Sequence, residues 1–358
     1  LMALTSLVLL CGYEFARSSA QSIFISTYGA KYLPHAMALI PIMAIAIVYA
    51  YGWILSLFGA KRAFIISCLF CALIFVAAQQ VLVAGFKPVA VFLFLFKETY
   101  VMLLVEQLWA LINSSPAATE GRVLYAPICG IAALGSVMGG FLVGFLSTRL
   151  GTNNLPLLVA VSLVFTALLG WVTFQYIGEP QPELADEKLG RDHSGIKAFF
   201  KDPRLLYLAI VVMLAQAMIM VLDVQLSHYV QLAIPTLDLR TQWFGMFYGY
   251  LNSGSVVFQF VVAPLLLKFV GPRLVHRGIP LVHIVFAAIS VFVPSLRTAA
   301  IALWIIKVVD YSVFRAAKEL VYVPFSYDVR YRAKQLIDVF GYRSAKGIVS
   351  VIMALLTS

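Results

Sequence analysis

The chain has 358 residues, of which 62% are hydrophobic and only 12% are charged. Soluble domains are nearer half apolar and a quarter charged, so this composition excludes an ordinary soluble domain and indicates a polytopic helical membrane protein. Lysine and arginine outnumber aspartate and glutamate by 26 to 16, which gives a net charge of +10. In a membrane protein, cytoplasmic loops explain this excess, so we expect the lipid bilayer and not a nucleic acid polymer as a partner.

Eleven apolar segments follow one another along the chain. They lie near residues 2–27, 35–57, 63–85, 88–112, 123–147, 155–177, 204–229, 243–268, 275–294, 299–322 and 333–356. The only long polar segment separates the first six from the last five. We therefore expect an N-terminal six-helix half at 1–177, a linker at 178–203 and a C-terminal half at 204–358. The odd total predicts a twelfth helix in the complete protein.

Basic residues in the short loops predict the orientation. They gather after the second, eighth and tenth segments and in the central polar segment, for example at Lys61, Lys197, Arg273 and Arg332. The opposite loops hold single basic residues. Even-numbered segments are therefore predicted to end in the cytoplasm, with the central loop cytoplasmic and the protein in a bacterial inner membrane.

The two halves resemble an internal repeat with an offset of about 210 residues. Four pairs of features lie near this offset: Phe58-Gly59-Ala60-Lys61-Arg62 and Phe269-Val270-Gly271-Pro272-Arg273, Glu14 and Asp223, Glu98 and Asp310, Gly130 and Gly341. Parallel six-helix repeats around a midplane site are the architecture of the major facilitator superfamily. The glycine turn with adjacent cations resembles that superfamily's loop signature after the second helix.

Charged side chains inside the apolar segments are candidate site residues. A charge at bilayer depth costs a few kcal/mol (roughly 2.5–3.5 on an insertion scale), so it must face a protein interior or a wet cavity. Glu14 and Arg17 are three residues apart and can pair on one helix face. Asp223 is isolated among Met and Leu. Of the adjacent Lys97 and Glu98, we expect Glu98 to face the cavity because it has a counterpart in the repeat.

The tenth and eleventh segments carry the most charges. Lys307 and Asp310 are three residues apart, as are Arg315 and Lys318. Two basic groups on one helix face repel each other, so they suit a shared anion such as a phosphate or a carboxylate. The alternative is that Lys318 lies hydrated at the cytoplasmic end of its helix.

Other motifs favour packing over chemistry. Gly135 with Gly139, and Gly140 with Gly144, have the spacing of close helix–helix contacts. The polar run at 18–22 lines a cavity or makes a polar helix contact, and both alternatives stay open. The sequence holds no P-loop, no G-x-S-x-G and no clustered metal ligands. We therefore expect no enzyme, no bound metal and no cofactor.

Two blocks near the C-terminus are more specific. Residues 312–324 read S-V-F-R-A-A-K-E-L-V-Y-V-P, and residues 332–347 contain R-A-K, D-V, G and A-K-G in order. Weaker matches lie at 13–17, 25–30 and 109–125. These stretches resemble the S-L-F-D-P-x-K-E-x-x-Y-I-P and K-G-K-A-x-x-D-V signatures of the ATP/ADP antiporter (nucleotide transporter) family, a divergent branch of the major facilitator superfamily.

The resemblance implies twelve helices and transport of nucleotides by exchange or with protons. By matched position it implies that Arg17, Glu98, Asp223 and Lys334 are charged site residues. The chain departs from the family where Arg-Asp-x-Lys in the first helix becomes Arg-Ser-Ser-Ala. The lost lysine weakens the case for triphosphate exchange, although Arg315, in place of the family's Asp, could restore one positive charge elsewhere.

These observations together predict a secondary active transporter of an anionic solute, such as a nucleotide or another phosphate or carboxylate compound. The predicted substrate-binding residues are Arg17, Glu98, Asp223, Asp310, Arg315 and Lys334. The cations would bind the anion, and the acids would pair with the cations when the site is empty. Two alternatives are a non-transporting membrane scaffold with a membrane-protein partner and a transporter of a phospholipid-like substrate.

Overall fold

The computed structural model describes residues 1–113, 122–177, 202–322 and 342–357. The described residues form α-helices, short 3-10 turns and two π-helical segments, with no strand among them. The chain divides into two compact units, Leu1–Gln181 with Val230–Ser253 and Pro182–Tyr229 with Gly254–Ser358. The predicted linker lies almost wholly outside the described residues, so the predicted division into halves stays a prediction.

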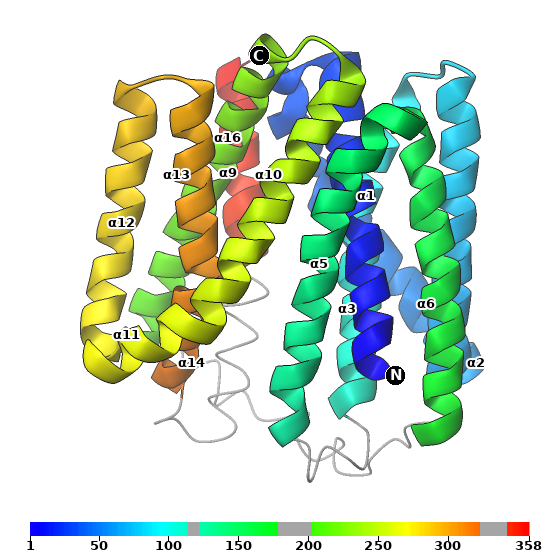
Figure 1. Cartoon of the computed structure of the whole chain (residues 1–358), viewed down its shortest axis with the longest axis horizontal. Coiled ribbons are helices and arrows are strands. Elements are labelled where there is room, and N and C mark those ends of the chain that lie inside the picture. The colour runs from blue at the N-terminus through cyan, green and yellow to red at the C-terminus, as the bar shows by residue number, and fades with distance from the viewer. Residues whose placement is uncertain (114–121, 178–201, 323–341, 358) are drawn as a thin grey trace. The chain divides into compact units, whose positions relative to one another are not determined.

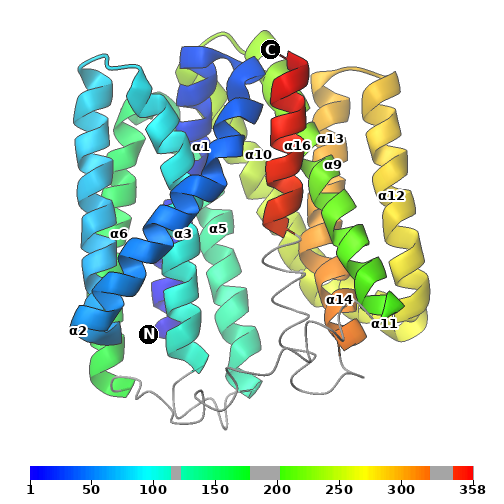
Figure 2. The same ribbon diagram turned by 180° about the vertical axis from the view of Figure 1, so that it is seen from behind.

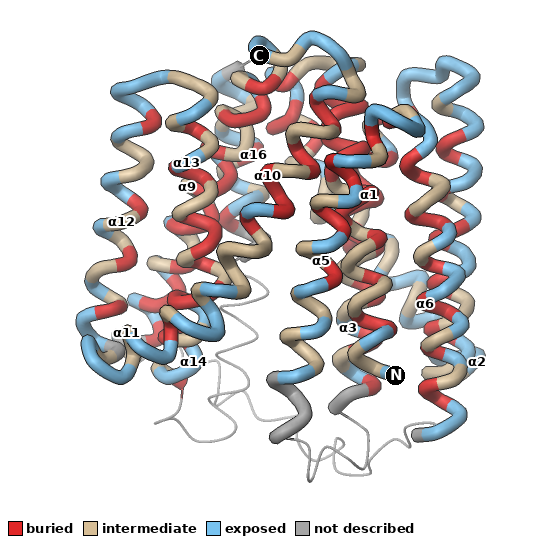
Figure 3. Tube along the Cα trace, viewed as in Figure 1, coloured by how far each residue is buried: buried red, intermediate tan, exposed pale blue. Residues whose placement is uncertain are grey.

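The first unit is built around its first helix. Its helices are α1 (Met2–Tyr28), α2 (Leu33–Val83), α3 (Pro88–Asn113), α5 (Arg122–Leu150), α6 (Leu155–Ile177) and the part of α10 (Leu237–Val257) up to Ser253. Helix α1 packs against α3, α5 and α6, while α2 packs against α3 and α6 (Figures 1 and 2). Most residues from 12 to 25 of α1 are buried, as the red stretches of α1 in Figure 3 show.

Two helical stretches of the second unit contain π-helical turns. Its helices are α9 (Pro203–Ala233, up to Tyr229), the π segment η3 (Phe258–Val262), α11 (Ala263–Phe269), α12 (Pro272–Phe292), α13 (Leu296–Val309), the π segment η4 (Asp310–Phe314), α14 (Arg315–Tyr322) and α16 (Tyr342–Thr357). Helices α12 and α13 run side by side, joined by a short turn that Ser295 and Thr298 cap reciprocally (Figure 1). Helices α13, η4 and α14 follow one another without a break.

Glycine turns lie where the repeat places them. Gly59 interrupts α2 with a φ of 74°, and Gly271 precedes α12 with a φ of 83°. Residues other than glycine rarely adopt these angles, because their Cβ atom clashes with the backbone. The predicted glycine turns are confirmed at both positions, and the turn at Gly59 separates the predicted segments 35–57 and 63–85.

The apolar exterior is that of a membrane protein. Many large apolar side chains are exposed, among them Trp53 at 66% and Phe292 at 82%. Soluble proteins rarely expose apolar side chains in such numbers. Seven helices in the described part of the chain are long and apolar enough to cross a membrane, and the stretch Ala30–Val83 among them holds two of the predicted segments. The all-α membrane fold expected from composition is confirmed.

Helices α1 and α5 approach each other closely at two glycines. A Cβ atom added to Gly135 would lie 2.2 Å from the carbonyl oxygen of Leu7, and one added to Gly139 would lie 2.5 Å from that of Cys11. Backbone atoms cannot move away from the added Cβ atom as the end of a flexible side chain can. The predicted packing role of the G-x-x-x-G motif is therefore confirmed.

We expect the substitution Gly139→Ala to destabilise the protein, because its methyl group overlaps the backbone of α1. Overpacking of this kind costs about 1–3 kcal/mol. The matched control is Gly52→Ala in α2, where no atom lies within 4 Å of the added Cβ. Since alanine favours helix over glycine by about 1 kcal/mol, the control should be neutral or stabilising. Thermal unfolding in detergent measures both, and equal midpoints would contradict the packing assignment.

Candidate functional site

A polar cluster is buried in the middle of α1 in the first unit. Glu14 is 1% exposed and lies about 20 Å from each end of its helix. Its Oε1 is 3.6 Å from Nη1 of Arg17, which confirms the predicted pairing of these two residues on one helix face. The same oxygen accepts a hydrogen bond of 2.9 Å from Nδ2 of Asn252 on α10. The carboxylate is thus paired with one cation and accepts one hydrogen bond from an amide.

An aromatic ring supports the arginine of this cluster. The guanidinium carbon of Arg17 lies 3.5 Å from the ring centre of Tyr248, and the hydroxyl of Tyr248 donates to Oε1 of Gln21 at 3.3 Å. A guanidinium is planar and weakly hydrated, so it can stack on a ring while its edge donates to carboxylates or phosphates. Tyr248 therefore supports the arginine from one side.

The neighbouring serines of α1 are packed. Ser18, Ser19 and Ser22 are at most 1% exposed, and the hydroxyl of Ser19 donates to the carbonyl of Phe15 at 2.6 Å. Of the two alternatives left open for this run, a helix contact fits these serines better than a cavity lining.

The second unit holds a stronger ion pair that joins two helices. Nζ of Lys307 on α13 lies 2.7 and 2.8 Å from the two carboxylate oxygens of Asp223 on α9. The lysine side chain is 4% exposed and that of Asp223 is 16% exposed. Lys307 lies about 17 Å from the start and about 22 Å from the end of the continuous stretch 296–322. The lysine therefore stands in the interior of this stretch, where little water reaches it.

Asp310 lies next to this pair along the helix. It is 2% exposed, begins the π segment η4 and accepts a hydrogen bond of 3.2 Å from Nε2 of Gln216 on α9. A π-helical turn rotates the following residues relative to an α-helix, and such turns recur at functional sites. Within the second unit, two of the predicted site residues thus take part in separate contacts that involve α9: Asp223 of α9 binds Lys307, and Asp310 binds Gln216, seven residues before Asp223 on α9.

In the fourth predicted segment, the lysine is the buried partner. Lys97 is 2% exposed, whereas the Glu98 side chain is 34% exposed, and the two form an ion pair within one helix. The ammonium group also lies 4.5 Å from the ring centre of Phe94. The repeat favoured Glu98 for the cavity. The rotation of α3 about its axis buries Lys97 and leaves Glu98 the more accessible of the two, and the role of Glu98 in a cavity stays a prediction.

The remaining predicted residues are placed differently. Arg315 is exposed at the start of α14, three residues before Lys318, which is 7% exposed. Lys334 lies outside the described residues. The structure therefore does not join Arg315 to the pair at Asp223, and the role of Lys334 stays a prediction.

Several residues of these clusters were not among the predicted site residues. Lys97 and Lys307 lie 210 residues apart, so the repeat offset could have marked them as a pair, and both are almost fully buried. Tyr248, Asn252 and Gln216 carry no sequence signal of this kind, since uncharged polar residues are common in membrane helices.

Comparison with known proteins identifies the fold. No protein-family model matches the sequence, and no curated protein matches it. Among solved structures, a point mutant of the nucleoside transporter NupG has a TM-score of 0.68 at 14% identity, covering 99% of this chain and 91% of that one. A bacterial homologue of the iron transporter ferroportin, in an inward-facing state, also has a TM-score of 0.68, at 15% identity, covering 98% of this chain and 91% of that one.

A third solved structure is more distant but agrees. The xylose transporter XylE from E. coli, in an inward-open conformation, has a TM-score of 0.58 at 15% identity, covering 99% of this chain and 89% of that one. This chain therefore has the fold of these membrane transporters, and the predicted major-facilitator-type fold is confirmed. At sequence identities this low, the similarity shows a shared fold and does not indicate the substrate.

We expect Tyr248→Leu to destabilise the first unit more than Tyr248→Phe does. Phenylalanine keeps the ring beneath Arg17 and loses only the hydroxyl contact with Gln21, whereas leucine also loses a cation–π interaction worth about 0.5–2 kcal/mol. Thermal unfolding in detergent separates the two. If the two variants lose equal stability, the ring does not hold the arginine.

We expect Asp223→Asn to lower stability by about 3 kcal/mol or more, because it leaves Lys307 charged and unpaired in an apolar interior. The double variant Asp223→Asn with Lys307→Gln removes both charges and should recover most of that loss. The control Glu106→Gln alters an exposed acid of α3 and should change little. A double variant as unstable as the single one would contradict the buried ion pair.

Proposed function

We propose that this protein is a secondary active transporter that moves an anionic solute across the membrane by alternating access. The observation that carries the proposal is that each unit holds a cation in the interior of a long helical stretch, with its side chain 12% or 4% exposed and paired with a carboxylate. Such charges are costly and persist where a solute or ion pathway requires them. The fold, found in transporters of nucleosides, iron and xylose, supports the same conclusion.

The sign of the solute follows from the partners of the two cations. Arg17 and Lys307 each bind a carboxylate of the protein itself, namely Glu14 and Asp223. A solute with a phosphate or carboxylate group offers the same oxygen atoms and competes with these internal partners. In the empty protein the internal pairs neutralise the cations, so binding of the solute exchanges one partner for another and shifts the conformational population.

The two cations would contact the solute differently. The guanidinium of Arg17 presents a planar fork, which matches two oxygens of one phosphate or carboxylate group. The ammonium of Lys307 is a point charge that binds a single group from any direction. Asp310 and Glu98 would then help the cations return to the pairs that they form in the empty protein. Lys334, whose role is implied only by the family resemblance, would add a further cation.

A nucleotide or a related phosphate ester is the solute class that we favour. The resemblance of residues 312–324 and 332–347 to nucleotide antiporters supports it, and one of the solved structures of the same fold is a nucleoside transporter. The missing lysine after Arg17 favours a solute with fewer negative charges than a triphosphate. We therefore place monophosphates and diphosphates ahead of ATP.

Transport by the purified protein in proteoliposomes tests this proposal. Vesicles loaded with one unlabelled compound should accumulate its labelled form, in a panel of inorganic phosphate, AMP, ADP, ATP, a nucleoside and a dicarboxylate. We expect exchange of at least one anion and none of the nucleoside. Arg17→Ala and Lys307→Ala should each lower the exchange rate at least about tenfold, because each removes a buried charged partner of the solute.

Two further variants separate binding from folding. Arg149→Ala removes an exposed arginine that stacks at 3.8 Å on Phe145, and it should leave exchange unchanged. The neutral double variant at Asp223 and Lys307 should fold yet fail to transport, since it keeps the packing and loses the cation. If no anion of the panel is exchanged and a membrane protein co-purifies, the protein is a membrane scaffold and not a transporter. If the protein moves only lipid, the proposed class of solute is wrong.

A further inference from the structure

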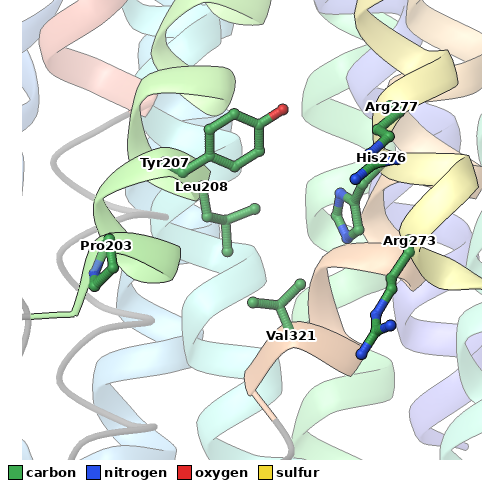
Figure 4. Close-up of a pocket in the computed structure, with 7 residues that line it drawn as sticks. All are labelled: Pro203, Tyr207, Leu208, Arg273, His276, Arg277 and Val321. Atoms are coloured by element: carbon green, nitrogen blue, oxygen red, sulfur yellow. The ribbon is translucent and has the colours of Figure 1, made fainter.

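A separate groove opens in the second unit, away from the buried ion pair. It has a volume of about 480 Å³ and lies between the first turns of α9, the first turns of α12 and the end of α14. Its walls are formed by Pro203, Tyr207, Leu208, Arg273, His276, Arg277 and Val321. Figure 4 shows the three basic side chains along one helix, across from Leu208 and Tyr207, with Val321 on a third helix.

The basic wall of the groove is suited to an anion. Arg273 and Arg277 are four residues apart, so they project from one face of α12 and repel each other. Both are exposed, and neither forms an ion pair with a described residue. An anion between them would relieve the repulsion and accept from two guanidinium forks. The unpaired N–H groups at the start of α12 add to the positive potential.

His276 makes the groove a fixed feature of the second unit. Its Nε2 lies 3.0 Å from the carbonyl oxygen of Ala317. A carbonyl oxygen only accepts, so Nε2 carries the proton and donates, which ties α12 to α14. The histidine therefore links two walls of the groove and is not itself the main anion ligand.

The depth of the groove identifies the kind of anion. The apolar stretches able to cross the membrane begin at Leu205 in α9 and at Arg273 in α12, so the groove lies where these helices enter the bilayer. Lipid phosphates occupy this level. The basic loops predict that this is the cytoplasmic side, where anionic lipids concentrate and where basic pockets between helices bind their headgroups.

We propose that this groove binds the headgroup of an anionic phospholipid. The phosphate lies between Arg273 and Arg277, and the glycerol and acyl chains run along Tyr207, Leu208 and Val321. A soluble phosphate compound would use the two arginines but would leave this apolar wall unused. The site does not depend on which solute the protein carries.

Native mass spectrometry of the full chain in detergent tests this site. The protein is titrated with phosphatidylglycerol or with phosphatidylcholine of the same acyl chains. We expect phosphatidylglycerol to bind more tightly. Arg273→Gln with Arg277→Gln should weaken its binding roughly 30-fold, since each arginine near the lipid surface contributes several-fold. Arg273→Lys with Arg277→Lys keeps both charges and should retain the preference for phosphatidylglycerol.

Two control variants replace a basic residue outside the groove by glutamine, the same kind of change as in the test variants. Arg297→Gln alters an exposed arginine at the second position of α13, as Arg273 is at the second position of α12, and Lys268→Gln alters an exposed lysine of α11 close in sequence to the groove. Both should change binding by less than about twofold. Equal loss in the controls would show general surface attraction and overturn the site.

Two further results would also overturn the proposal. One is equal affinity for the two lipids. The other is displacement of phosphatidylglycerol by millimolar inorganic phosphate, which would indicate a site for soluble anions. Should the glutamine variants fail to fold, thermal stabilisation of the unaltered protein decides: phosphatidylglycerol must raise the unfolding temperature more than phosphatidylcholine does.

Discussion

A positive charge in the middle of a membrane helix has no water to hydrate it, so the protein itself must supply the partner within a few ångströms. The described helices meet this constraint in three ways. Lys307 reaches a carboxylate on another helix, Arg17 uses a carboxylate on its own helix and an aromatic ring on α10, and Lys97 uses the residue beside it. Only the first arrangement joins two helices through both oxygens of the acid, so it couples the position of α13 to that of α9.

The backbone packing of the first unit explains why its cluster is so deeply buried. Glycines on α5 let α1 approach until a methyl group would overlap its backbone, and small serines on α1 are enclosed in the same way. A helix held on three sides cannot turn its polar residues toward lipid. Glu14 and Arg17 must therefore find partners inside, and they find them in Asn252 and Tyr248.

The two basic sites of the second unit differ in depth and therefore in chemistry. Lys307 stands in the interior of the continuous stretch 296–322, where Asp223 neutralises it. Under the proposed function, an anionic solute exchanges with that acid. Arg273 and Arg277 stand at the edge of the apolar stretch, where water screens them and no acid of the described chain pairs with them. Under the two proposals, the same positive charge binds a transported anion at one site and a lipid headgroup at the other.

Local sequence patterns determined the helical class, the positions of the apolar segments, the glycine turns at Gly59 and Gly271, and the pairing of Glu14 with Arg17. Composition and periodicity suffice for the helical class and the apolar segments, the three-residue spacing suffices for the pairing of Glu14 with Arg17, and the repeat offset marked the two glycine turns. Which helices become neighbours, and how each is rotated about its axis, depends on packing between residues far apart in the chain. For that reason only the tertiary structure decided that Asp223 pairs with Lys307, that Tyr248 lies under Arg17, and that Lys97 and not Glu98 is the buried member of its pair.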